Sequence, residues 1–325
     1  MNIKAVLTAA VMAAVGMVTQ AAAQTEVKFG HVGEPGSLMD LSATEFAKRA
    51  NEKLGDKAKV VVYGSSQLGD DKALLQKLKL GTADMALPST IMSSVVPIFG
   101  LFEMPYLVHD REHMKRIRDE IVVPEMEPAA EKAGYHVIGV WENGFRQITN
   151  NKKPITVPAD LKGIKLRVPS GEWRVKMFQA YGASPSPMSL SEVFVALQTG
   201  VMDGQENPYA QIYPSRFYEV QKYLSKSNHV YTPAYVTAGR SWSKFDPEVQ
   251  QVLTDTAVEM QDVVYGIAAD LEKDLLQKLL DAGMEANEVD TQAFVEASKP
   301  IYDQFAQSVD GAGDMIAKAQ SLSDQ

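Results

Sequence analysis

The segment 161–208 contains two side chains that are suited to holding an anion. Arg167 ends a short apolar run, and Asn207 lies in a predicted loop after a second such run. A guanidinium can bind a carboxylate through two parallel hydrogen bonds, which fix its direction as well as its charge. Between these residues the sequence predicts two helices and contains no nucleophile motif, metal-ligand cluster or phosphate-binding loop. This pattern favours binding an anion over transforming one.

The first 23 residues are typical of an export signal. Lys4 precedes an apolar stretch over 5–18, and alanines at 21–23 supply small residues at the expected cleavage position. We therefore expect the mature chain to begin near Gln24. The sequence contains no cysteine, which excludes a lipoprotein anchor and a fold that depends on disulfides. Export without cysteine is typical of a large periplasmic domain.

The size and net charge of the chain further limit the class of protein. A mature chain of about 300 residues is large enough for two lobes. The sequence carries 41 acidic and 32 basic residues, a formal net charge of −9, which argues against nucleic acid as a partner.

His109 and His113 have neither an HExxH motif nor a third ligand nearby. We therefore expect no metal and no cofactor, and we expect the histidines at 109, 113, 136 and 229 to lie on the surface.

A similar order of elements recurs in the two halves of the chain. In each half a helix ends at a glycine (Gly81, Gly200), and an aspartate follows three residues later (Asp84, Asp203). Glycine at these positions suits a left-handed helix end. Matching α/β units predict two similar lobes that face each other. The predicted elements are strands over 60–63 and 85–87 around a helix in the first half, and a strand over 164–168 with helices over 173–181 and 191–199 in the second.

The C-terminal third predicts one long helix. Asp246 is a candidate cap, Pro247 suits the first turn, and Glu248 lies near the positive end of the helix dipole. Apolar residues then recur at intervals of three and four until Gly283. One helix, or a kinked pair, over this span would be on the order of 50 Å long and would brace both lobes. The other expected elements are strands over 25–30 and 135–141, a helix over 37–54, a capping box of Ser189 and Glu192, and a helical tail from Thr291 interrupted at 310–313.

Four motifs resemble those of a known family. They are SSQLGDDKALLQKLKLG, FEMPYLV, KLRVPSGEW and GASPSPMSLSEVFVALQTGVMDGQENP. They look like solute-binding proteins of tripartite ATP-independent periplasmic (TRAP) transporters, of the dicarboxylate-binding (DctP) type. The similarity covers essentially the whole mature chain, and the run ALQTGVMDGQENP is its most specific part.

The resemblance implies a fold, a function and a partner. The fold is an α/β periplasmic-binding-protein clamp of two lobes with a long helix spanning both, lobe 1 being 24–143 plus about 233–271 and lobe 2 being 144–232 plus about 272–325. The function is capture of an organic acid (a C4-dicarboxylate, a hydroxy or keto acid, or a sugar acid) in the periplasm. The protein is expected to be a monomer and not an enzyme. The partner is a sodium-driven TRAP membrane permease, to which the acid is delivered.

The resemblance also assigns roles to residues of the site. Arg167 would pair with the substrate carboxylate, and Asn207 would be the substrate-binding asparagine. Arg146 would be a second arginine that contacts the ligand. Asp71 and Ser89 would supply polar contacts from the first lobe.

Several positions depart from the pattern of members that bind sialic acid. Those members carry a polar asparagine two residues past an FG pair, whereas Gly30 is followed by His31 and Val32 here. They also have an acid where this chain has Ser89 and an aromatic residue where it has Leu190. The departures disfavour sialic acid and leave the contacts beyond the carboxylate open.

Five further side chains are candidates for lining the site. His31 and Glu34 follow the first predicted strand, while Trp141, Trp173 and Tyr209 could form walls of the pocket. Each has a structural alternative, because a lone histidine is often packed or hydrogen-bonded and aromatic residues beside strands usually belong to the core.

The two arginines have structural alternatives as well. Arg167 could form an ion pair with Glu172 or Glu206, which would offset the cost of burying its charge. Arg146 could be a surface residue within a polar loop.

The amide and the acidic pair also have local explanations. Asn207 precedes a proline and could shape a turn. One residue of the pair Asp70 and Asp71 is expected to cap the helix that follows, and Asp71 is the one expected to reach the cleft.

Two other functions are open at this point. A binding lobe of the same design could report its ligand to a membrane sensor in place of a permease. An exported enzyme acting on acidic small molecules could use Glu206 and Asp203 as acid and base, although the sequence contains no GxSxG motif and no cysteine nucleophile.

Overall fold

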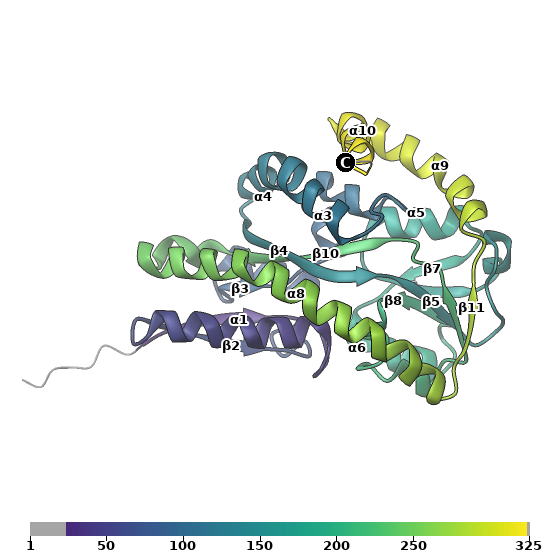
Figure 1. Cartoon of the computed structure of the whole chain (residues 1–325), viewed down its shortest axis with the longest axis horizontal. Coiled ribbons are helices and arrows are strands. Elements are labelled where there is room, and N and C mark those ends of the chain that lie inside the picture. The colour runs from purple at the N-terminus through teal and green to yellow at the C-terminus, as the bar shows by residue number, and fades with distance from the viewer. Residues whose placement is uncertain (1–23, 324–325) are drawn as a thin grey trace, which may run out of the picture.

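The computed structural model describes residues 24–323, so the predicted export signal lies outside the described residues. Two β-sheets with helices packed around them make up the molecule (Figure 1). Among the helices of this region, none combines the length and the apolar character needed to cross a membrane. The α/β class predicted from the sequence is confirmed.

The first sheet is a parallel unit extended by two antiparallel strands. Its strand order is β2-β1-β3-β10-β4. Strand β1 pairs in parallel with β2 and β3, and β10 runs antiparallel to β3 and β4. The strands are β1 (Thr25–Gly30), β2 (Ala58–Tyr63), β3 (Met85–Ala86), β4 (His136–Phe145) and β10 (Tyr231–Ala238).

The second sheet is built in a similar way from the second half of the chain. Its order is β11-β9-β5-β8-β6-β7, with β6 parallel to β7 and β8, and β5 antiparallel to β8 and β9. Strand β11 pairs in parallel with β9 at the edge. The strands are β5 (Gln147–Asn150), β6 (Lys165–Val168), β7 (Ser184–Pro187), β8 (Gly204–Asn207), β9 (Tyr223–Lys226) and β11 (Glu285–Glu288).

The helices pack around the sheets, and several begin at a polar cap. Ser37 caps α1 by accepting a hydrogen bond from the amide of Asp40, and Asp70 caps α2 by accepting one from the amide of Ala73. The helices are α1 (Leu38–Leu54), α2 (Asp71–Leu80), α3 (Arg111–Ile117), α4 (Glu127–Lys132), α5 (Glu172–Ala180), α6 (Leu190–Gln198), α7 (Tyr209–Ile212), α8 (Pro247–Asp281), α9 (Thr291–Ser308) and α10 (Ala312–Ser321).

Two aspartates at equivalent places confirm the repeat of the α/β unit. The carboxylate of Asp84, before β3, accepts a hydrogen bond from the amide of Lys28 at 2.8 Å, and its own amide donates to the carbonyl of Lys28 at 3.2 Å. Asp203, before β8, makes the same two bonds with Lys165 at 2.9 and 2.8 Å. The succession β1-α1-β2-α2-β3 therefore corresponds to β6-α5-β7-α6-β8.

The sequence prediction omitted one strand of the second unit. The residues 184–187 read SPSP and form β7, whereas the prediction placed two helices in succession without a strand between them. Proline cannot donate to a sheet ladder, but β7 lies at the edge of its sheet, where this is tolerated. The left-handed helix ends are confirmed, because Gly81 and Gly200 both have a φ of 72°.

Two of the connections between the sheets lie side by side, and α8 later forms a third by leading from β10 to β11. Strand β4 ends at Phe145 and β5 begins at Gln147, so Arg146 alone joins them, and residues 227–230 return the chain from β9 to β10. The two connections contact each other, since the amide of Arg146 donates to the carbonyl of Val230 at 2.9 Å and Ser227 Oγ donates to the carbonyl of Arg146 at 3.3 Å. The exact division of the chain into lobes stays a prediction.

Helix α8 is one continuous helix, as predicted. The side chain of Asp246 accepts from the amide of Glu248 at 2.8 Å at its start. Its 35 residues span on the order of 50 Å. The helix contacts α1 and β4 beside the first sheet and α7 beside the second, and Leu279 near its end lies in the apolar cluster of the second half. In Figure 1 it runs diagonally past both sheets.

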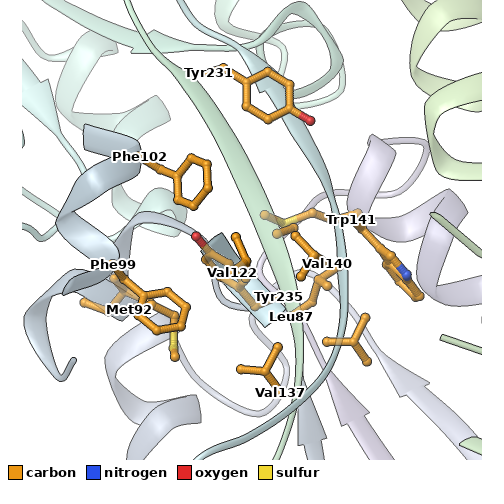
Figure 2. Close-up of a cluster of buried hydrophobic side chains, with 14 of the residues drawn as sticks. Leu87, Met92, Phe99, Phe102, Val122, Val137, Val140, Trp141, Tyr231 and Tyr235 are labelled. Atoms are coloured by element: carbon orange, nitrogen blue, oxygen red, sulfur yellow. The ribbon is translucent and has the colours of Figure 1, made fainter. Parts of the chain in front are cut away.

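The main apolar core covers both faces of β4 and β10. Tyr235 packs edge-to-face on Phe99, with ring centroids 4.8 Å apart, and lies near Phe102. Trp141 lies on the other side of these strands (Figure 2), where it packs against Phe46 and donates from Nε1 to the carbonyl of Ala257 in α8 at 2.8 Å. This bond fixes α8 to the first sheet.

The C-terminal tail is helical with an interruption before Ala312, as predicted. Helix α9 packs against α5, and α10 packs against the 3-10 segment Pro97–Glu103 of the first half. The last two helices therefore contact segments of both halves.

A substitution at Gly266 tests the description of the long helix α8. It is an exposed glycine inside α8 with no heavy atom within 4 Å of an added Cβ. We expect Gly266→Ala to raise the free energy of unfolding by about 0.5–1 kcal/mol, because glycine weakens a helix interior. Urea unfolding measures the change.

Gly239→Ala is the matched control. Its Cβ would lie 2.4 Å from the carbonyl oxygen of Leu78 in α2, so the same substitution should destabilise the protein. A loss of stability in Gly266→Ala would contradict the description of α8.

Candidate functional site

A cavity lies between the two halves of the molecule, beside the place where the chain crosses between the sheets. Ser189, at the start of α6, donates from Oγ to the carboxylate of Asp70, at the start of α2, at 2.7 Å. These two helices are equivalent in the repeat, so the bond joins the halves across the cavity. The polar residues that line it are Asp70, Asp71, Lys72, Ser89 and Thr90 from the first half, Asn143 and Arg146 near the crossing, and Arg167, Ser170, Ser189, Asn207 and Gln211 from the second.

Only half of the predicted capping box forms at α6. The Glu192 carboxylate accepts a hydrogen bond from the amide of Ser189 at 3.2 Å. The Ser189 hydroxyl instead bonds to Asp70 of the other half, as described above. Ser189, which the sequence predicts as a helix cap, thus contacts the other half of the molecule.

Arg167 enters the cavity from β6 and is 3% exposed. Its Nε and Nη2 donate to the carbonyl of Met188 at 2.9 and 2.5 Å. Within residues 24–323 no carboxylate forms an ion pair with it and no hydrogen bond uses its Nη1, while Glu172 pairs with Lys176. Burial lowers the pKa of Arg167 to about 10, and the attraction of Glu206 opposes that shift. A buried guanidinium without its own carboxylate is suited to an external anion.

Arg146 is held by the strand that carries Asn207. Its Nε donates to Glu206 Oε2 at 2.5 Å, and its Nη2 donates to Glu206 Oε1 at 3.1 Å and to Asn207 Oδ1 at 2.9 Å. It is 3% exposed, so it is not a surface residue. In the part of the chain that the structure describes, its Nη1 forms no hydrogen bond, and the residue lines the cavity.

Asn207 ends strand β8, so its prediction as a loop residue is wrong. Its register opposite Gln147 of β5 places it beside Arg146. Its Nδ2 donates to Gln205 Oε1 at 2.6 Å and its Oδ1 accepts from Arg146. Among residues 24–323 the amide nitrogen donates no second hydrogen bond, and the amide oxygen fixes the Arg146 guanidinium.

A second buried arginine completes the charge network behind the cavity. Arg174 of α5 donates to Glu206 at 2.7 Å and to Glu103 at 3.0 Å, and His229 Nε2 lies 3.1 Å from Glu206 Oε2. Burial acts to raise the pKa of Glu206, but the charges of Arg146 and Arg174 and the His229 bond hold it well below its usual range. Glu206 therefore stays ionised.

The carboxylates of the network behind the cavity form ion pairs with two of the three buried arginines, but not with Arg167. Glu206 and Glu103 offset the charges of Arg146 and Arg174. The remaining carboxylate that faces Arg167 is Asp71, which lies on the opposite half.

Both residues of the acidic pair at the start of α2 line the cavity. Asp70 caps α2, and Asp71 lies on the cavity wall. Burial raises the pKa of Asp71 to about 6, although the positive charges of Arg167 and Arg146 oppose this. Ser89 also lines the cavity, with its hydroxyl donating to the carbonyl of Pro233 at 2.6 Å.

Five candidates from the sequence lie outside the cavity lining. His31 is fully buried beneath Gly64 and its pKa is lowered to about 4 by burial, while the half-buried Glu34 precedes α1. The indole of Trp141 belongs to the core described above, and Trp173 packs edge-to-face on Phe305 at 5.0 Å. Tyr209 is half-buried between the two apolar clusters. His31, Trp141 and Trp173 are buried inside the fold, which residue type alone does not indicate.

The expectation that the histidines are on the surface is wrong for two of them. His113 and His229 are 1% and 0% exposed. His113 Nε2 lies 2.8 Å from the carbonyl of Ala319, and His229 Nδ1 lies 2.8 Å from Ser227 Oγ. These hydrogen bonds offset the cost of burying the two imidazoles. The partner of His113 lies far from it in the sequence. Among residues 24–323, no group of three or more potential metal ligands is found.

Several residues of the site are not among those predicted from the sequence. Arg174 and Glu103 lie in helical segments and had no local signal. Gln211 lies on α7, shortly after Asn207 at the end of β8, and Asn143 lies three residues before Arg146. Proximity to those two predicted residues is the signal that could have identified Gln211 and Asn143.

Glu206→Ala tests the buried charge network. Removing this carboxylate leaves Arg146 and Arg174 with uncompensated buried charge, so we expect the free energy of unfolding to fall by about 3–5 kcal/mol. Urea unfolding checks this. Glu219→Ala is the control, because Glu219 pairs with the exposed Arg216 and should change stability by less than about 1 kcal/mol. Equal effects of both substitutions would show that the network contributes no special stability.

Asp71→Asn tests the protonation of the cavity wall. The folded pKa of about 6 exceeds the ordinary 3.8, so between these values the folded state binds more protons than the unfolded state. Stability of the wild type therefore falls as pH rises through this window. The variant lacks this loss, so its stability relative to wild type should increase from about pH 4 to about pH 7 and level off above. A difference that is constant with pH, measured by urea unfolding, would contradict the assignment.

Comparisons with known proteins agree with this architecture. The profile of the DctP family, described as bacterial extracellular solute-binding protein, family 7, matches residues 29–308. The 2,3-diketo-L-gulonate-binding periplasmic protein YiaO of Escherichia coli K12 is 30% identical over 304 residues, 92% of each chain. A TRAP periplasmic solute-binding protein from Polaromonas sp. JS666, bound to D-erythronate, superimposes with a TM-score of 0.89 at 30% identity, over 93% of this chain and 100% of that one. One from Sulfurospirillum deleyianum, with bound succinate, gives 0.87 at 32% identity, over 93% and 100%. The chain therefore belongs to the DctP family of bacterial extracellular solute-binding proteins, family 7.

Proposed function

We propose that this protein captures an organic acid in the periplasm and delivers it to the membrane subunits of a TRAP permease. The observation that carries the proposal is Arg167, a buried guanidinium that lines a cavity between the two halves and has no carboxylate partner among the described residues. The Nη1 groups of Arg167 and Arg146 are available to a carboxylate. Charge-assisted bonds of this kind are stronger than neutral ones and fix the orientation of the acid.

The charge of the cavity favours an acid with one carboxylate and several hydroxyls. Glu206 already offsets Arg146, so Arg167 is the cation that a ligand would balance. A second carboxylate would face Asp71, and like charges in a buried site disfavour each other. Hydroxy acids and sugar acids fit better than a C4-dicarboxylate on this ground. Bound D-erythronate in the Polaromonas relative and 2,3-diketo-L-gulonate binding by the Escherichia coli relative support this choice, while the succinate-bound relative shows that dicarboxylates occur in the family.

Capture would proceed by closure of two lobes around the acid. The lobes are 24–143 with about 233–271, and 144–232 with about 272–325, and the hinge is the crossing at Arg146 and 227–230. A ligand that contacts both lobes stabilises the closed form, because only that form provides all of its contacts. The bond between Ser189 and Asp70 would form on closure, since its two groups belong to different lobes.

The location and the partner follow from the family and the export signal. The relatives described above are periplasmic, and residues 1–23 of this chain have the composition of an export signal. The protein would act as a monomer without a cofactor and without catalysing a reaction. Release to a permease requires only that the closed lobes reopen.

Calorimetric titration of wild type and Arg167→Met with D-erythronate, L-gulonate, 2,3-diketo-L-gulonate and succinate tests the function. We expect wild type to bind at least one of these acids and the variant to bind it about 100-fold or more weakly, because a charged hydrogen-bonded partner of the carboxylate is lost. Stability without ligand should stay within about 1 kcal/mol of wild type, since no internal ion pair is broken.

Arg216→Met is the matched control, because this arginine is exposed and pairs with Glu219 at the surface. Its affinity should equal that of wild type. Equal binding by wild type and Arg167→Met would remove the assigned role of Arg167, and failure of wild type to bind any organic acid would overturn the proposed function.

A further inference from the structure

We infer that Gln211 binds a hydroxyl group on the carbon chain of the captured acid and so determines specificity. This inference rests on the function proposed above. Gln211 lies on α7 directly after Asn207 and Pro208, and its amide donates to the carbonyl of Pro208 at 2.9 Å, which fixes the start of this short helix. The residue lines the cavity together with Arg146 and Asn207.

The side chain of Gln211 is buried without a protein partner. It is 3% exposed, and its carboxamide makes no hydrogen bond within residues 24–323, with Nε2 fully enclosed. Two other buried glutamines nearby are paired: Gln205 Nε2 donates to Thr149 Oγ1 at 2.9 Å, and Gln221 Nε2 donates to the carbonyl of Val220 at 3.0 Å. Buried polar groups are nearly always paired, so the partner of Gln211 is expected to come from outside the chain.

The chemistry of the carboxamide matches a hydroxyl. A carboxamide offers a donor and an acceptor side by side, and a hydroxyl likewise donates and accepts. The carboxylate of the ligand is drawn to Arg167, which has a charge to balance, whereas Gln211 has none. Asp71 disfavours a second carboxylate in the same space. A hydroxyl is therefore the group that satisfies Gln211 at the least electrostatic cost.

Asn143 and Ser89 are less suited to this role. Asn143 Nδ2 already donates to Thr232 Oγ1 at 3.0 Å, and the Ser89 hydroxyl hydrogen is committed to Pro233. Each can still accept a hydrogen bond but has fewer groups to offer. Gln211 is the cavity amide in the described region whose donor and acceptor are both uncommitted.

The experiment compares wild type with Gln211→Met, which keeps an unbranched side chain of similar length and removes the amide. Calorimetry gives the affinities of both proteins for D-erythronate and its 2-, 3- and 4-deoxy analogues, or for L-gulonate and its monodeoxy analogues if wild type binds gulonate more tightly. We expect one analogue to bind wild type about five- to tenfold more weakly than the parent acid. In Gln211→Met that difference should disappear, because the hydroxyl has lost the same partner.

Gln261→Met is the matched control, since Gln261 is a buried glutamine of α8 that does not line the cavity. Its discrimination between parent and deoxy acids should equal that of wild type. Without ligand, Gln211→Met should unfold at the same temperature as wild type or higher, because an unpaired buried amide is removed. A purely structural role of Gln211 would instead lower this temperature and leave discrimination intact.

Failure of the inference about Gln211 can be distinguished from failure of the proposed function. If wild type binds an acid but every hydroxyl-dependent difference persists in Gln211→Met, the inference about Gln211 is wrong and the proposed function stands; an ordered water bonded to Gln211 would give this result. If wild type binds none of the acids, the proposed function fails and the inference fails with it.

Discussion

The carboxylate of Glu206 is the constraint on which the binding region depends. It is fully buried, and a buried carboxylate is stable only with charged or hydrogen-bonded partners. Arg146 comes from the connection between the sheets, Arg174 from α5, and His229 from the returning connection. Because these segments must converge on one side chain, the network fixes the crossing of the chain and the rear wall of the cavity together.

The same network separates the buried arginines into those with an internal carboxylate partner and one without. Arg146 and Arg174 are balanced internally, so they stabilise the fold and hold the wall in position. Among residues 24–323, Arg167 donates hydrogen bonds only to a backbone carbonyl, so its charge has no internal carboxylate partner. A binding protein gains from this separation, because its folded structure does not depend on the ligand whereas its closed form does. The repeated α/β unit then places the starts of α2 and α6 opposite each other, where Asp70 meets Ser189.

Much of the fold could be predicted because its signals are local. Asp246, Pro247 and the apolar spacing that follows define α8, and the paired glycines and aspartates define the repeat. Strand β7 is not predictable in this way, because proline-rich residues are compatible with a strand only at a sheet edge, and edge position is a property of the whole sheet. The burial of His229 cannot be predicted from the sequence, because its partner Glu206 lies on a distant strand. The core position of Trp141 cannot be predicted either, because residue type does not reveal which face of a strand is inside.

The sequence by itself determined the elements, their repeat, the family resemblance and the side chains most suited to an anion, since each depends on residue type and short-range spacing. Only the tertiary structure decided which of those side chains share a cavity. It brought Arg167, Arg146, Asn207, Asp71 and Ser89 together, placed His31, Glu34, Trp141, Trp173 and Tyr209 elsewhere, and added Gln211. The physical reason is that charge compensation and burial involve partners far apart in the chain, so the availability of a group for a ligand is known only once its internal partners are known.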